Sequence, residues 1–354
     1  MNTGSKNVNR IEFIDIARAI AMVFVVIGHI NFANSCIKAW VYAFHMSAFF
    51  LISGTVAKWR DDYTGKRLIS DTYKSFVSLI IPYILWALVY CDFSLANLAR
   101  IAYGSYDALS HAGTLTSLWF LPVMFIALLL FRICNLLFRK LNKEAFHTML
   151  IIVLSIISLI VGFIIPNTSF GYPFSINIAF TAFGFLLIGH LFSTTLNRAN
   201  AKLKDYSGSK MAVSSVLISL VVIVGSFLIT LLYRYNIPDH GYVLMGNGIY
   251  GNPFLFMIVA LFGSVMIFSL AWLICAMRIE MFENMMVFIG MNTLAIFFVQ
   301  KPIIAVFSKL FSRIHIHSCL ALSVTCVGTM AVCCFVAHMI NKMAPNLVGR
   351  NHIN

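Results

Sequence analysis

The chain has 354 residues, of which 60% are hydrophobic and only 10% are charged, and its mean hydropathy is +0.90. This composition excludes an ordinary soluble domain and indicates an integral membrane protein. The net charge of +13 does not indicate nucleic-acid binding, because the basic residues lie in short segments between apolar runs, where positive charge sets membrane topology.

Ten apolar runs are each long enough to cross about 30 Å of hydrocarbon as a helix. They lie near residues 13–32, 37–57, 74–92, 117–138, 147–165, 174–194, 211–233, 253–277, 285–308 and 317–340. The sequence therefore predicts an all-α, polytopic membrane protein with about ten transmembrane helices. We expect one domain over residues 1–354, with the helical bundle at about 11–340 and short tails at 1–10 and 341–354.

The segments between the runs set the orientation. With a cytoplasmic N-terminus, the inner segments hold eighteen Lys and Arg residues, whereas the outer segments hold six, namely Lys38, Arg100, Arg234, Lys301, Lys309 and Arg313. Because positive charge is retained on the cytoplasmic side, both termini are predicted to be cytoplasmic. On this topology Arg18 lies towards the cytoplasmic side of the first span and His29 towards the outer side.

The first span, RIEFIDIARAIAMVFVVIGHINF, covers residues 10–32 and carries ionisable groups at or inside the bilayer. They are Asp15, Arg18 and His29. A charge at the bilayer centre costs about 2.5 to 3.5 kcal/mol on insertion scales, so such residues normally face a protein interior or a wet cavity. At about 100° per residue the three side chains share one helix face, with His29 about 16 Å along the axis from Arg18. We therefore expect them to face one water-accessible chamber.

Two interpretations of this helix face stand on the residues alone. A histidine is the usual general base near neutral pH, so His29 can take a proton from an attacking hydroxyl while Arg18 holds an anionic group, with Asp15 orienting Arg18. Alternatively, Asp15 and Arg18 form a structural ion pair at the inner interface, and His29 makes polar contacts near the outer one.

Other polar residues lie within or beside the later runs. His45, in FHMSAFFLISG of the second span, is either part of the site or structurally hydrogen-bonded, and Ser53 and Gly54 offer a small surface where another helix can approach closely. Trp119 at the start of the fourth span fits an interface anchor, and Asn292 in the ninth run fits a hydrogen bond between helices. The eight cysteines contain no C-x-x-C pair, so no metal site is predicted.

Two of the predicted spans are interrupted by proline. Pro82 in the third span frees a backbone carbonyl that needs another partner, which predicts a kink. In the ninth run Gln300, Lys301 and Pro302 break the apolar sequence, and we expect its helix to end near Val299.

The ordered set of motifs resembles acyltransferase family 3, and within it the branch of fucose O-acetylase-like proteins and the enterobacterial common antigen O-acetyltransferase. The first span has Arg18, ten intervening residues and then His29, which is the family's signature. The stretches FIDIARAIAMVFVVIGHI, FHMSAFFLISG, the third-span PY, LWFL and GMNTLAIFF follow in the family's order, so the resemblance covers about residues 10–340.

The resemblance implies transfer of an acyl group, most often acetyl from acetyl-CoA, to a hydroxyl of a surface glycan or of its lipid-linked precursor, in the bacterial inner membrane. His29 would be the family's essential histidine, acting as base or transient acyl carrier. Arg18 would be its paired basic residue, with Asp15 positioning either one. No metal is implied. The candidate substrate- or cofactor-binding residues that we add are His45, Lys74, Trp119 and Asn292.

The chain departs from the family pattern in two places. Many members carry Arg-x-x-Arg before the third-span proline, where this chain offers Lys74 and the expected loop residues Lys66 and Arg67. A histidine often stands where this chain has Gln300, so we assign Gln300 no catalytic role.

Two other function classes compete with an enzyme. A secondary transporter or glycan flippase would use the buried His and Arg to bind a proton or an anionic substrate, although no two-half repeat is evident. A non-catalytic membrane partner of a glycan synthase is the second.

Overall fold

The computed structural model describes residues 12–30, 35–140, 144–311 and 318–349, and within them the chain is helical, without a β-strand. Nine helical stretches in this part are long and apolar enough to cross a membrane. They match the second to tenth predicted spans, so the all-α, polytopic prediction is confirmed. The bounds of these helices are α2 Ser35–Tyr42, α3 His45–Val56, α4 Gly65–Ser75, η1 Phe76–Ile80, α5 Ile81–Tyr90, α8 Phe120–Phe138, α9 Glu144–Ile164, α10 Ile176–Asp205, α11 Gly208–Leu232, α12 Pro253–Met277, α14 Thr293–Phe311 and α15 Ser318–Met343.

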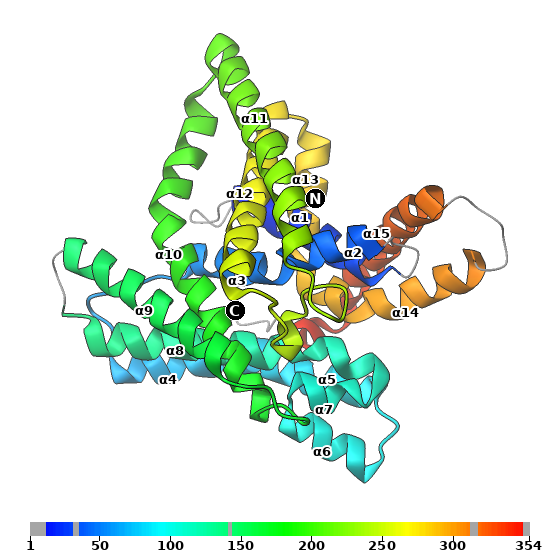
Figure 1. The fold of residues 1–354 in the computed structure, drawn as a ribbon. Helices are drawn as coiled ribbons and strands as arrows, with labels where there is room; N and C mark the ends of the chain where they lie inside the picture. Colours follow the sequence, from blue (N-terminus) through cyan, green and yellow to red (C-terminus); the bar gives the residue numbers. More distant parts are fainter. Residues whose placement is uncertain (1–11, 31–34, 141–143, 312–317, 350–354) are drawn as a thin grey trace.

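The first predicted span forms α1, Glu12–His29, which lies near the centre of the molecule (Figure 1). It is not one of the nine strongly apolar stretches, because it carries three charged residues, Glu12, Asp15 and Arg18. Twelve of its eighteen residues are nevertheless buried. It packs against α3, α12, α13 (Glu280–Met291), α14 and α15. A helix with this charge is therefore enclosed by protein, as the cost of exposing charge to lipid requires.

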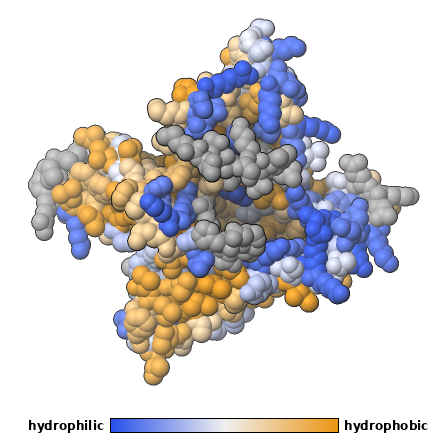
Figure 2. Space-filling model, turned by 180° about the vertical axis from the view of Figure 1, so that it is seen from behind, coloured by the Kyte–Doolittle hydropathy of each residue, from blue (hydrophilic) through white to orange (hydrophobic). Residues whose placement is uncertain are grey.

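Exposed hydrophobic side chains mark the helices that have few protein neighbours. On α11 they include Val216, Leu220, Ile223 and Phe227. Figure 2 shows broad hydrophobic areas on one face of the molecule beside separate hydrophilic ones. Such faces suit contact with lipid.

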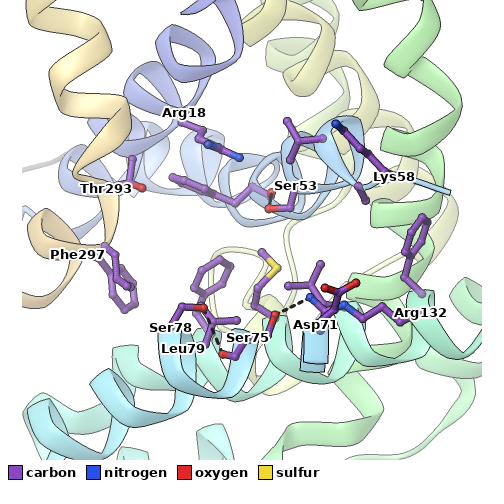
Figure 3. Close-up of a pocket in the computed structure, with 18 of the residues that line it drawn as sticks. Arg18, Ser53, Lys58, Asp71, Ser75, Ser78, Leu79, Arg132, Thr293 and Phe297 are labelled. Carbon is purple, nitrogen blue, oxygen red and sulfur yellow. Dashed lines mark hydrogen bonds between the residues drawn. The ribbon is translucent and has the colours of Figure 1, made fainter. Parts of the chain in front are cut away.

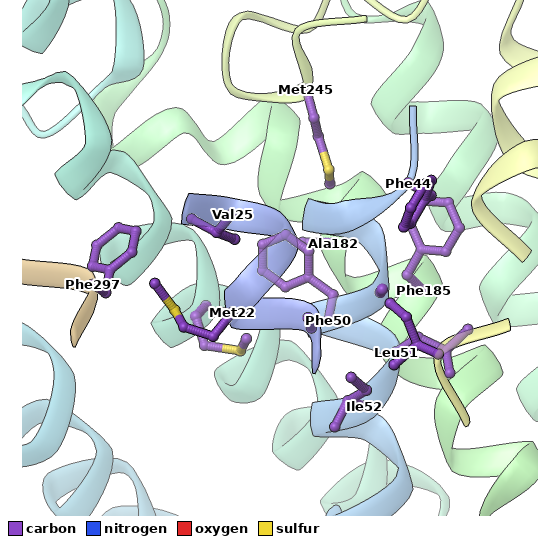
Figure 4. Packing of buried hydrophobic residues seen from close by; sticks show 14 of the residues in the cluster. Met22, Val25, Phe44, Phe50, Leu51, Ile52, Ala182, Phe185, Met245 and Phe297 are labelled. Atoms are coloured by element: carbon purple, nitrogen blue, oxygen red, sulfur yellow. The ribbon is translucent and has the colours of Figure 1, made fainter. Parts of the chain in front are cut away.

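Inside the molecule, Met22 and Val25 of α1 belong to the same buried hydrophobic cluster as Phe50 of α3 and Phe185 of α10 (Figure 4).

The third predicted span begins earlier than the sequence suggested. Its helix starts at Gly65, because the Thr64 side chain accepts a hydrogen bond from the Arg67 backbone N–H and caps the first turn. The prediction that Lys66 and Arg67 lie in a loop is therefore wrong. The turn before Pro82 is the π-helical segment η1, which connects α4 to α5.

The ninth predicted run breaks at a different residue from the one expected. α13 ends before Asn292, and α14 continues from Thr293 through Pro302 to Phe311, so the predicted end near Val299 is wrong. Proline cannot donate to the carbonyl four residues earlier, which here is Phe298. The Tyr90 hydroxyl of α5 donates to that carbonyl instead, over 2.8 Å, and the helix is able to continue.

Two glycines let α3 and α10 approach at backbone distance. A Cβ added at Gly54 would lie 1.9 Å from the Leu186 carbonyl oxygen, and one added at Gly189 would lie 1.9 Å from the Leu51 carbonyl oxygen. The close helix approach predicted at Ser53 and Gly54 is confirmed.

Replacing Gly54 by Ala should destabilise the protein, because the added methyl group would force two backbones apart. We expect a loss of about 1 to 3 kcal/mol, seen as a lower midpoint of thermal unfolding in detergent. Gly65→Ala is the matched control, since a Cβ there meets nothing within 4 Å. Equal midpoints for the two variants would contradict the close contact.

The Tyr90 bond to α14 can be tested by a double-mutant cycle. Tyr90→Phe leaves the Phe298 carbonyl without its donor, which should cost about 1 to 3 kcal/mol. In a Pro302→Ala background the new backbone N–H can serve that carbonyl, so the same change should cost clearly less. An equal fall of the unfolding midpoint in both backgrounds would show that the hydroxyl does not serve this role.

Candidate active site

A cavity of about 500 Å³ lies between α1, α3, α4, η1, α8, α14 and the segment 57–63. In Figure 3, Arg18 and Lys58 lie on one side of it and Ser75, Ser78 and Arg132 on the other. Four cations and one carboxylate line it. Its polar lining is Arg18, Ser53, Lys58, Arg60, Tyr63, Asp71, Ser75, Ser78, Arg132, Asn135 and Thr293, and its apolar lining includes Met22, Val25, Met46, Phe49, Phe120, Met124, Leu128, Phe131, Leu294 and Phe297.

The basic residues of this large cavity are held by hydrogen bonds from neighbouring helices. Arg132 of α8 donates through Nη2 to the Ser75 hydroxyl over 2.6 Å, while its Nη1 is buried and has no hydrogen-bond partner among the described residues. The Asn135 side chain accepts from the Arg60 backbone N–H at 3.2 Å and donates to the Arg60 carbonyl at 3.0 Å. The segment that carries Lys58 and Arg60 is thereby fixed to α8.

Tyr63 and Asp71 form the acidic part of the same wall. The Tyr63 hydroxyl donates to the Asp71 carboxylate over 3.2 Å. Burial, together with that carboxylate, raises the pKa of Tyr63 to about 12, so the hydroxyl stays protonated and keeps donating at neutral pH. Asp71 is the only Asp or Glu in the lining of this cavity within the described residues.

Arg18 enters the large cavity from α1 and pairs with Asp15. Their side chains are 3.3 Å apart, and the Asp15 side chain is almost completely buried. The ion pair considered from the sequence is therefore present. The Arg18 guanidinium is partly exposed, so it remains accessible to an anionic group in the cavity.

His29 lines a second, smaller cavity of about 270 Å³, together with Gly28, Lys38, Tyr42, Lys301, Ile304 and Ala305. The expectation that Arg18 and His29 share one chamber is therefore not met in this structure. The two residues are about three turns apart on the helix, and the large cavity follows that face only as far as Met22 and Val25. Val25 precedes His29 by one turn, so a single turn of α1 separates the cavity linings.

Aromatic rings surround His29 on one side. Its ring centroid lies 6.4 Å from that of Tyr42, which in turn lies 4.8 Å from Tyr242. The Lys38 ammonium lies 4.7 Å from the centroid of Tyr242 and 5.6 Å from that of Tyr42, within the range of cation–π attraction. Lys38 is thus held beside the small cavity by two rings.

His45 is buried next to this group and contacts Tyr42, with ring centroids 4.8 Å apart. Its Nδ1 lies 2.8 Å from the Val41 carbonyl oxygen. A carbonyl oxygen only accepts, so Nδ1 carries the hydrogen and, in the neutral ring, Nε2 is the basic nitrogen. His45 lines neither cavity, and it touches the His29 site through Tyr42.

The remaining residues selected from the sequence lie outside both cavity linings. Lys74 is exposed on α4, one residue before the buried Ser75. Trp119 is buried against Tyr106 and the backbone near Gly246. Asn292 donates to the Phe288 carbonyl and accepts from the Asn341 amide over 2.6 Å, which confirms the hydrogen bond between helices.

Several cations of the two cavities were not selected from the sequence. Arg132 and Lys301 each interrupt an apolar run, and an ionisable residue inside a span is by itself a signal of function. Lys58 and Arg60 follow α3 in a segment where basic residues are expected from topology alone, so nothing local distinguishes them. Among the described residues, no three His, Cys, Asp or Glu side chains cluster so that they could hold a metal ion.

Comparison with known proteins identifies the family. A family model described as an acyltransferase domain, from acyltransferase family 3, matches residues 11–338. This range includes every residue that lines the two cavities. No curated protein and no solved structure gives a significant match. The match over nearly the whole chain, with the membrane-spanning helices and the ordered motifs, shows that this multi-pass membrane protein belongs to acyltransferase family 3.

Proposed function

We propose that the protein is an O-acetyltransferase of the bacterial inner membrane. It would move an acetyl group from acetyl-CoA to a sugar hydroxyl of a cell-surface polysaccharide or of its lipid-linked precursor. The observation that supports this most is the large cavity, which is cationic at the side predicted to be cytoplasmic and apolar along α1, and which ends one turn from His29.

The cationic part of the large cavity suits the phosphate groups of the coenzyme. Arg18, Lys58, Arg60 and Arg132 outnumber the single carboxylate of Asp71. Arginine is well adapted to phosphate, because its planar guanidinium can donate two parallel hydrogen bonds. The buried Nη1 of Arg132 has no protein partner in the described part of the chain, and such a donor is stabilised when a ligand oxygen accepts from it.

The apolar part of the cavity suits the acyl end of the donor. Met22 and Val25 of α1, Phe49 of α3 and Phe297 of α14 line it and extend it from Arg18 towards His29. Methionine and phenylalanine provide an adaptable apolar wall and exclude water from a thioester. In this arrangement the phosphates stay with the cations and the acetyl group points along α1.

His29 would carry the proton transfer. In direct transfer, the acceptor oxygen attacks the thioester carbonyl carbon, the carbon–sulfur bond breaks, and the hydroxyl proton passes through the His29 imidazole to the departing coenzyme thiolate. In a two-step route, a neutral His29 nitrogen bonds to the carbonyl carbon, the carbon–sulfur bond breaks and the coenzyme leaves as a thiolate. The acceptor oxygen then bonds to the same carbon, the carbon–nitrogen bond breaks, and the hydroxyl proton passes to the coenzyme thiolate. In both routes Arg18 would hold donor charge, and its ion pair with Asp15 supports this orientation.

Replacing His29 by Ala should abolish transfer of labelled acetyl from acetyl-CoA to glycan in isolated membranes, because either route needs the imidazole. Removal of a catalytic base alone typically costs a factor of about 10² to 10⁴. His338→Ala is the matched control, since His338 is exposed on α15 and lines neither cavity. Retained transfer at normal protein abundance would remove His29 from the mechanism, and an absence of label on glycan with the unmodified protein would favour a transporter.

Replacing Arg132 by Gln should weaken use of the donor more than it weakens the chemistry. One lost charge-assisted contact to phosphate corresponds to about 1.5 to 3 kcal/mol, so the KM for acetyl-CoA should rise at least about tenfold. The control is Lys140→Gln, because Lys140 is exposed just beyond the end of α8. An unchanged KM in Arg132→Gln would place the coenzyme phosphates elsewhere.

A further inference from the structure

The small cavity around His29 is cationic. Lys38 and Lys301 both line it, and no Asp or Glu of the described residues does. Neither lysine forms an ion pair within the described part of the chain, where the recorded pairs are Arg18 with Asp15 and Arg67 with Asp62. The cavity therefore holds two positive charges with no protein carboxylate to balance them.

These lysines are predicted to lie on the side of the membrane where positive charge is normally rare. Both lie in segments predicted to face outwards, where this chain has only six of its Lys and Arg residues. Positive charge is normally kept on the cytoplasmic side, and a charge inside the helical bundle is costly unless it serves a purpose. Lys301 lies within α14, beside Pro302, where the Tyr90 hydroxyl serves the carbonyl that the proline leaves without a donor.

The two charges reach the cavity from different helices. Lys38 of α2 lies against the rings of Tyr42 and Tyr242, and Lys301 belongs to α14, whose Ile304 and Ala305 line the same cavity. His29 lines it from α1. An anion in this space would meet ammonium groups from two different helices beside the imidazole.

We infer that the acceptor carries an anionic group, a carboxylate or a phosphate, which Lys38 and Lys301 bind while the hydroxyl to be acylated lies at His29. This inference rests on the proposed function, since it assigns the substrate class of the same site. The two lysines select acidic glycans over neutral ones of the same shape, because a neutral acceptor would leave both ammonium groups without a counter-charge.

The experiment uses polysaccharide from cells that lack this protein, so that it is not yet acylated, in three forms. One is untreated, in the second the carboxyl groups are reduced to alcohols, and in the third phosphate is removed with hydrogen fluoride. Purified protein in lipid nanodiscs is supplied with labelled acetyl-CoA. We expect transfer to fall at least about tenfold on one of the two modified forms, and that form identifies the anion as carboxylate or phosphate.

The outcomes separate this inference from the proposed function. Equal transfer to all three forms would overturn the anionic acceptor and leave the acetyltransferase intact. No transfer to any form, or to the lipid-linked precursor from the same cells, would contradict the acetyltransferase itself.

A lysine series assigns the selectivity to these residues. Lys301→Gln should raise the KM for the untreated polymer about tenfold. It should also remove the difference in transfer between the untreated polymer and the modified form that the unaltered protein uses poorly. Lys301→Arg keeps the charge and should preserve that difference. Lys309→Gln is the matched control on the same helix, since Lys309 does not line the cavity. A Lys301→Gln variant that keeps full selectivity, or that raises the KM for acetyl-CoA instead, would overturn the inference.

Discussion

The burial of α1 is the constraint on which the rest of the structure depends. The helix carries Asp15, Arg18 and His29, and such groups are stable inside a bilayer only where protein or water surrounds them. Helices α2, α3, α12, α13, α14 and α15 pack against it. The enclosure is close enough that a Cβ at Gly290 of α13 would lie 1.9 Å from the Asp15 carbonyl oxygen, so the backbone of α13 packs directly on the turn that holds the ion pair.

Two cavities lie along α1, one beside its middle turns and one at its C-terminal end. Arg18 faces the large cavity, in which arginines, lysine and one carboxylate form the polar wall, and His29 faces the small one with two lysines. A transferase that joins a cytoplasmic donor to an outward-facing acceptor needs such a division, because each substrate must enter from its own side. The turn from Val25 to His29 is where the two would have to meet, and the cavities join there only if side chains on that turn or opposite it move.

Much of the fold could be predicted from the sequence, because hydropathy is a local property that marks the spans one by one. The glycine contact at Gly54 could also be predicted, since small residues are needed wherever membrane helices approach closely. The end of the ninth helix could not, because the donor that lets α14 continue past Pro302 is the hydroxyl of Tyr90, 208 residues away from Phe298. Arg18 and His29 could be identified as candidates because they lie on one helix. Arg132 and Lys58 could not, because they meet only through the tertiary contact between α8 and the segment after α3.

The central claim is that the donor binds along α1, with its phosphates at the cations of the large cavity and its acetyl group at His29. A structure of the protein bound to an acetyl-CoA analogue in which a methylene group replaces the thioester sulfur would test it most directly. We expect the phosphates to contact Arg132 and its basic neighbours, and the acetyl carbonyl to lie beyond Val25 beside His29, with the two cavities joined. An analogue that binds with its acetyl group away from His29, with the Val25 turn still closed between the two cavities, would contradict this route.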